Sequence, residues 1–221
     1  MKVCLAYHHV PCLPVEPSST KLASDRFYRT YKEFPPGYPH ELIWNLHDSP
    51  GRDIAAHQAI APYLDCDFAV FMSARVFFKR EGWLMRLMEV RRLCGEGVYG
   101  IMASNEACPL YPEQKSNPHM RTCLFGCNPK DMSRHDQVKS VEQSFEFESG
   151  GGINNVAKWQ TFLVGWDGIY DKATWRKMPN GFRSGDQSNL LAHDRHSLAF
   201  DLATPEQKVM LTRIADGETI E

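Results

Sequence analysis

The chain has 221 residues and a formal net charge of −2, with 43% hydrophobic and 24% charged residues. These values are typical of one globular domain with a true core, and the nearly neutral charge argues against a broad nucleic-acid footprint. No run of 18 apolar residues occurs, and the first apolar run is too short for a secretory signal. We therefore expect a cytoplasmic protein without a membrane span.

Short apolar runs predict the sheet. The four runs at residues 3–6, 41–46, 67–72 and 98–102 have consecutive apolar positions, which favours strands that are covered on both faces. Helical patterns fill residues 53–62 and 81–94 between them. This alternation predicts right-handed βαβ units and an α/β fold with a mostly parallel central sheet.

The remaining segments are less regular. Residues 11–39 carry six prolines around a possible short helix at 25–32, and residues 105–119 form a second irregular stretch. Near the end, Thr204 precedes Pro205, which predicts a capped helix that runs to about residue 216 and stops at Gly217.

The seven cysteines form an odd, irregularly spaced set, which favours reduced thiols. Cys123 and Cys127 have the spacing of half a zinc site, but no second pair stands at a suitable distance. Buried free thiols are therefore the favoured interpretation.

Three segments resemble GT-A glycosyltransferases of the family 2 type: ELIWNLHDSPGRD at 41–53, AHQAIAPYLDCDFAVFMSARVFFKREGWLMRLM at 56–88, and FESGGGINNVAKWQTFLVGWDGIYD at 147–171. The resemblance implies a Rossmann-like, single-domain GT-A fold over residues 1–221. Residues 1–104 would be the nucleotide-binding half, and residues 105–221 the acceptor and catalytic half. It also implies sugar transfer, with inversion, from a nucleotide-sugar donor to an acceptor that the sequence does not name.

The sequence departs from this family where the acidic DxD motif should follow the third strand. Ser73, Ala74 and Arg75 stand there instead, while Asp65 and Asp67 precede the strand and should lie at the opposite end of the sheet. A DxD motif holds Mg²⁺ or Mn²⁺ against the diphosphate. Arg75 could meet the same negative charge directly, because a guanidinium binds phosphate bidentately. We therefore expect a reduced or absent metal requirement.

Arg75 also has two simpler interpretations, and the sequence does not exclude them. A strand-end arginine is often solvated, and this one could pair with Asp48 or Glu81.

Four further residues are candidates for the nucleotide side of the site. Tyr7 and His8 end the first strand, where a nucleobase would stack, although they could be an ordinary strand end. By family position, Asp48 would contact the base or ribose, and Asp53 stands close by. Turn or cap roles account for both aspartates equally well.

On the catalytic side, the resemblance makes Glu148 the candidate base, at the start of a helix. Asp186 and Gln187 open an apparent helix and faintly resemble a family element near the donor sugar. His193, Asp194 and His196 could hold a metal ion, but histidines that satisfy helix C-terminal carbonyls are commoner. A solvent-facing acid is the alternative for Glu148.

Two further function classes remain. A protein that kept the fold and lost catalysis would account for the missing DxD motif. An unrelated nucleotide-binding α/β enzyme is less favoured, because no GxxxxGK[ST] or GxGxxG loop follows a strand.

Overall fold

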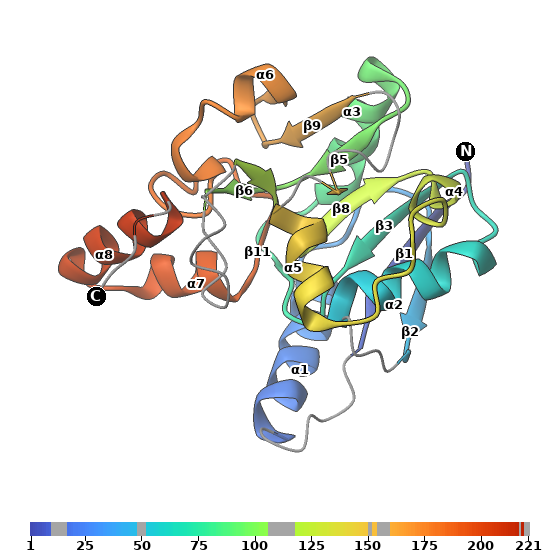
Figure 1. Ribbon diagram of the computed structural model, residues 1–221, viewed down its shortest axis with the longest axis horizontal. Coiled ribbons are helices and arrows are strands. Elements are labelled where there is room, and N and C mark those ends of the chain that lie inside the picture. The colour runs from blue at the N-terminus through green and yellow to red at the C-terminus, as the bar shows by residue number, and fades with distance from the viewer. Residues whose placement is uncertain are drawn as a thin grey trace.

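The computed structural model describes residues 1–9, 17–47, 52–105, 118–149, 152–153, 160–216 and 218. Figure 1 shows a central sheet with helices on both of its faces. The sheet has seven strands in the order β10-β9-β5-β8-β3-β1-β2. Their bounds are β1 (Val3–His8), β2 (Glu41–Asn45), β3 (Phe68–Met72), β5 (Val98–Gly100), β8 (Leu124–Cys127), β9 (Thr161–Val164) and β10 (Ile169–Asp171).

The predicted α/β class, the single domain and the mostly parallel sheet are confirmed. All four predicted strands are present as β1, β2, β3 and β5, and they point the same way as β9. Strands β8 and β10 run in the opposite direction. Two small two-stranded sheets join β4 (Phe77–Phe78) to β11 (Ala192–His193) and β6 (Ala103–Ser104) to β7 (His119–Met120).

The strand β8 was missed from the sequence. It has four residues, all buried, and it lies between β3 and β5. Cys127 belongs to this strand and Cys123 immediately precedes it; both are buried free thiols, and burial raises the pKa of each. A zinc site at this pair has no support in the fold.

Helices cover the two faces of the sheet because each strand alternates its side chains. Leu5 and Tyr7 of β1 pack on one face in the cluster that contains Phe27 and Trp83. Ala6 and its neighbours pack on the other face in a second cluster. The eight helices described here are α1 (Pro17–Glu33), α2 (Arg52–Ile60), α3 (Trp83–Cys94), α4 (Pro129–Met132), α5 (Val141–Ser149), α6 (Lys172–Trp175), α7 (Arg195–Leu202) and α8 (Pro205–Ala215).

Two helix predictions have different outcomes. The helix α1 is much longer than the expected 25–32 segment. The α8 prediction is confirmed: Thr204 caps the helix in a capping box with Gln207, and Pro205 occupies its first turn. Gly217, the expected stop, lies outside the described residues. No helix in the described part of the chain is long and apolar enough to cross a bilayer.

The order of the first three strands positions the site. Strand β1 pairs in parallel with β2 on one side and with β3 on the other, so the chain reverses its direction of travel across the sheet at β1. Ligands in open α/β sheets bind outside the carboxyl ends of the strands at such a reversal. We call the carboxyl ends of β1, β2 and β3 the nucleotide edge, because the resemblance predicts that this half of the chain binds the nucleotide.

The acidic pair Asp65 and Asp67 lies at the opposite end, as the sequence predicted. The Asp67 carboxylate accepts a 2.8 Å hydrogen bond from the backbone N–H of Lys2, just before β1 begins. Asp65 forms a 2.7 Å ion pair with the Lys2 ammonium. Neither aspartate reaches the nucleotide edge.

Candidate functional site

Ser73, Ala74 and Arg75 follow β3 directly at the nucleotide edge. The backbone N–H of Ser73 donates to the Cys123 carbonyl at 2.8 Å, and the Ser73 hydroxyl accepts from the backbone N–H of Arg75 at 3.4 Å. The Ala74 carbonyl accepts a hydrogen bond from the Tyr7 hydroxyl at 3.2 Å. Hydrogen bonds to Cys123 and to Tyr7 therefore fix the backbone of this turn, and with it the position of Arg75.

The Arg75 side chain is half-buried, and its guanidinium makes no hydrogen bond or ion pair with any residue in the described ranges. Glu81, one alternative partner, is therefore not its partner; Asp48, the other, lies outside the described residues. The charge of Arg75 still reaches Asp53, because it contributes to lowering the pKa of that carboxyl. Among the described residues, a cation without a hydrogen-bond partner therefore stands at the position where the resemblance predicts a DxD motif.

Asp53 lies in the first turn of α2 and is fixed by His8. The two side chains meet at 2.7 Å between His8 Nδ1 and Asp53 Oδ1. Burial raises the pKa of Asp53, but the hydrogen bond with His8 and the positive charge of Arg75 act in the opposite direction, and the pKa ends below its usual value. The second His8 nitrogen lies 3.2 Å from the His47 carbonyl. Both ring nitrogens of His8 therefore lie next to acceptor oxygens.

His57 belongs to the same group and was missed from the sequence. Its ring is completely buried on α2, 6.0 Å from the His8 ring and close to Phe71 and Phe125. Neither of its nitrogens has a hydrogen-bond partner in the described structure. Burial lowers the pKa of His57 to about 3, so the ring is neutral at pH 7.

Tyr7 does not occupy an open stacking position. Its ring is fully buried and stacks on Phe27 at a centroid distance of 3.7 Å, while Trp44 contacts it edge-on at 5.3 Å. Burial raises the pKa of the Tyr7 phenol to about 12. A nucleobase could reach this ring only if the surrounding aromatic side chains moved away.

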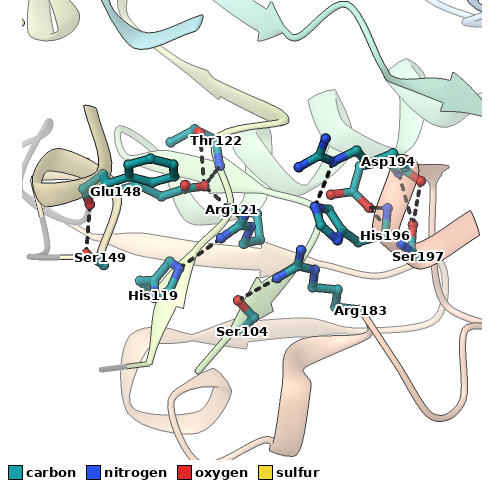
Figure 2. A network of polar contacts seen from close by, with 12 residues as sticks. Ser104, His119, Arg121, Thr122, Glu148, Ser149, Arg183, Asp194, His196 and Ser197 are labelled. Atoms are coloured by element: carbon teal, nitrogen blue, oxygen red, sulfur yellow. Dashed lines mark hydrogen bonds and ion pairs between the residues drawn. The ribbon is translucent and has the colours of Figure 1, made fainter. Parts of the chain in front are cut away.

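Glu148 lies in the last turn of α5, rather than at the start of a helix as the resemblance implied. Its Oε1 accepts hydrogen bonds from the Thr122 backbone N–H at 2.8 Å and from the Thr122 hydroxyl at 3.0 Å. Arg121 Nε lies 3.4 Å from the same oxygen (Figure 2). Thr122 precedes Cys123, the partner of Ser73, so the fold brings Glu148 and Ser73 to the same edge of the sheet.

Two largely buried arginines extend this group into a polar network that the sequence did not reveal (Figure 2). Arg121 Nη1 lies 3.2 Å from His119 Nε2, and Arg183 Nη1 donates to the Ser104 hydroxyl at 3.3 Å. The charges of both arginines help to lower the pKa of the buried Asp194, against the opposing effect of burial. Figure 2 shows Arg121 and Arg183 between Glu148 on one side and Asp194 on the other.

Asp194 is a helix cap in this structure. Its Oδ1 accepts the backbone N–H groups of His196 at 2.9 Å and Ser197 at 2.8 Å, at the N-terminus of α7. His193 lies 3.0 Å from the Ser197 hydroxyl, and His196 receives a hydrogen bond from Arg195. The histidines therefore stand at the start of a helix, not at its C-terminus as the sequence suggested.

The arrangement of these three side chains gives the metal prediction no support. No group of three or more His, Cys, Asp or Glu side chains is arranged to hold a metal ion in the ranges that the structure describes. Burial lowers the pKa of His193 to about 4 and that of His196 to about 3, so both rings are neutral at pH 7.

Asp186 and Gln187 do not open a helix; they lie in the irregular segment before β11. The exposed Asp186 carboxylate accepts the Ser188 backbone N–H at 2.8 Å, and this bond lowers its pKa. The Gln187 amide is buried and donates to the carbonyls of Arg183 at 2.9 Å and Ser197 at 3.0 Å. Gln187 therefore joins two segments of the chain to each other.

The site thus has two chemically different parts. The nucleotide edge offers a cation, a hydroxyl and an ionised carboxylate in Arg75, Ser73 and Asp53, which suit an anionic ligand with hydroxyl groups. The network around Glu148 offers a carboxylate and largely buried arginines, which suit a polar group next to that ligand. Ser73 and Cys123 connect the two parts through their backbone hydrogen bond.

No protein-family model and no curated protein sequence matches the chain. Solved structures with some likeness include HddC from Yersinia pseudotuberculosis, with 6% identity, a TM-score of 0.36, and coverage of 63% of this chain and 83% of that chain. A CMP:2-keto-3-deoxy-manno-octonic acid synthetase complexed with CTP has 10% identity, a TM-score of 0.42, and coverage of 69% and 87%.

A third structure, of a Bacillus anthracis protein assigned as a glucose-1-phosphate thymidylyltransferase, has 11% identity, a TM-score of 0.41, and coverage of 94% and 99%. At these identities and TM-scores, the likenesses do not identify a family or an activity for this chain.

Proposed function

We propose that this protein is a GT-A-like glycosyltransferase that binds a nucleotide sugar at the nucleotide edge and transfers the sugar to an acceptor. One observation carries the proposal. Where the strand order reverses around β1, the turn after β3 presents the Arg75 guanidinium, which makes no hydrogen bond or ion pair with a described residue, within electrostatic reach of the ionised Asp53. The likeness of three sequence segments to GT-A enzymes supports the same function.

Each group has a role that its chemistry suits. Arg75 binds the diphosphate bidentately and stabilises the charge that develops as it leaves. Asp53, held by His8, accepts hydrogen bonds from ligand hydroxyl groups. Ser73, Ala74 and Arg75 include no carboxylate, so they do not fit a divalent cation of the Mg²⁺ or Mn²⁺ type, and no step of the reaction is assigned to a metal.

The transfer step needs a base for the acceptor. The acceptor oxygen attacks the anomeric carbon, a new glycosidic bond forms, and the bond to the diphosphate breaks with its electron pair going to the diphosphate. The acceptor proton passes to Glu148, the carboxylate at the same edge as Ser73.

The test is a calorimetric titration of nucleoside diphosphates and nucleotide sugars, with and without EDTA. Binding should survive EDTA, and Arg75→Ala should weaken it by about 1.5–3 kcal/mol, the scale of a hydrogen bond to a charged group. Arg92→Ala, which removes an exposed arginine from α3, is the matched control and should bind normally. Binding that EDTA abolishes and that ignores Arg75→Ala would refute the phosphate role.

A second candidate function is nucleotide-sugar binding without transfer. The contacts of Glu148 favour it, because one oxygen of this carboxylate already meets two Thr122 donors and Arg121. Donor hydrolysis and transfer assays separate the two functions. If Glu148 is the base, Glu148→Gln should lower turnover by about 10²–10⁴-fold with donor binding kept, while Glu142→Gln on the same helix should not. A wild-type protein that binds donors without any turnover would favour the binding function.

A further inference from the structure

Two aromatic side chains are exposed beside the nucleotide edge. Trp44 of β2 is 42% exposed and Tyr28 of α1 is 45% exposed, and their ring centroids are 6.2 Å apart. Large aromatic rings contribute much apolar surface, and their exposure next to a ligand edge marks a contact surface. The Lys32 Nζ atom lies 4.4 Å from the centroid of the Tyr28 ring, so Lys32 covers one face of that ring.

Three aromatic rings contact the Trp44 ring at steep angles. The Trp44 ring meets Tyr7, His9 and Phe27 at interplanar angles of 84°, 65° and 80°. The Tyr28 ring is tilted against it by 45°. No ring of the described residues stacks parallel on the indole, and 42% of the Trp44 surface is exposed.

The position of Trp44 fits one end of a bound nucleotide. Trp44 pairs in register with Tyr7, one residue before the described ends of β1 and β2, while Arg75 follows β3 on the other side of β1. Neighbouring strands are about 4.8 Å apart, so β2 and β3 are separated by about 10 Å. A ligand that places its diphosphate at Arg75 and extends across β1 brings its other end to Trp44.

We propose that Trp44 is the surface on which the nucleobase of the donor stacks. This inference rests on the proposed function and gives the stacking role to Trp44 instead of the buried Tyr7. Stacking uses the π-face that every base has, so Trp44 supports the base without selecting among bases. The protein should therefore lose affinity for different nucleoside diphosphates to a similar extent when Trp44 is removed.

The experiment compares UDP, GDP and inorganic pyrophosphate by calorimetry. Trp44→Ala should lower the affinity for UDP and for GDP by about 5- to 150-fold, which is the effect of losing one base–aromatic stack. The affinity for pyrophosphate should stay unchanged. Trp44→Phe keeps an aromatic face and should retain most of the affinity. Tyr63→Ala is the matched control, because Tyr63 is 82% exposed and lies before the amino end of β3.

A fluorescence measurement covers the case in which Trp44→Ala does not fold. UDP should quench the tryptophan emission of the wild type, and Trp44→Phe should bind UDP with that quenching lost. Normal UDP binding by folded Trp44→Ala, or unchanged quenching in Trp44→Phe, would overturn this inference and leave the proposed function standing. A wild type that binds pyrophosphate but neither UDP nor GDP, or that binds none of the three ligands, overturns the proposed function as well.

Discussion

At the scale of single residues, the fold keeps three histidines neutral, of which His57 and His193 are buried and His196 is half-buried. Burial lowers the pKa of His57 to about 3, of His193 to about 4 and of His196 to about 3. His57 is the clearest case, because neither ring nitrogen has a described hydrogen-bond partner. An unsatisfied buried ring costs free energy, and its protonation in the folded state would cost more.

The pH dependence of stability follows from these pKa values. The unfolded chain binds a proton at each histidine near pH 6.5, but the folded chain does not until about pH 3–4. The unfolded state therefore holds more protons in this range, and the free energy of unfolding decreases as the pH falls.

His57→Leu replaces the ring with an apolar side chain of similar volume. It should reduce by one the difference in bound protons between the unfolded and the folded state. Denaturation curves between about pH 6 and pH 4 should show a slope that is smaller by about 1.4 kcal/mol per pH unit than in the wild type. An unchanged slope in His57→Leu would mean that His57 is already protonated in the fold.

At the scale of secondary structure, the N-terminal cap of α8 makes a measurable contribution to the stability of this helix. The Thr204 hydroxyl accepts from the Gln207 backbone N–H at 3.4 Å, and the Gln207 side chain accepts from the Thr204 backbone N–H at 3.0 Å. Together the two side chains satisfy backbone donors that would otherwise lack partners at the start of the helix.

Thr204→Ala should destabilise α8 by about 1 kcal/mol, the usual value for a lost N-cap. Hydrogen exchange of the α8 amides should report this as faster local opening. Thr212→Ala is the control. Thr212 lies on the same helix, and its hydroxyl donates to the Lys208 carbonyl at 2.8 Å, so alanine at this position should be neutral or slightly stabilising. Equal protection in Thr204→Ala and the wild type would show that packing alone holds α8 in place.

At the scale of the whole molecule, the two halves of the chain are interleaved in one sheet. The strand β8, from the second half, lies between β3 and β5 of the first half. The strand β5 pairs with β8 and β9, so residues 1–104 contain no strand that pairs with β5. The expected nucleotide-binding and catalytic halves therefore share their core.

A fragment of residues 1–104 should not fold by itself, because it lacks β8 and would expose the apolar face around Phe71, which stacks on Phe125. Its amide NMR spectrum should show the narrow dispersion of an unfolded chain, while the full chain should unfold in one cooperative transition. A well-dispersed spectrum of the fragment would show that the first half is an independent domain.

Local patterns in the sequence were enough for much of the fold. The apolar runs predicted β1, β2, β3 and β5, and Thr204 with Pro205 predicted the start of α8. The end of the run at Met72 placed Arg75 after β3. The α/β class followed from the alternation of these elements, because periodicity and capping depend on residues that are neighbours along the chain.

Only the tertiary structure decided which side chains are buried, exposed or paired. It inserted β8 between β3 and β5, enclosed Tyr7 between Phe27 and Trp44, and left Trp44 half open. It also joined Glu148 to Thr122, a contact between residues 26 positions apart. Such contacts depend on how distant segments pack against one another, and one sequence read along its length contains no direct signal of that packing.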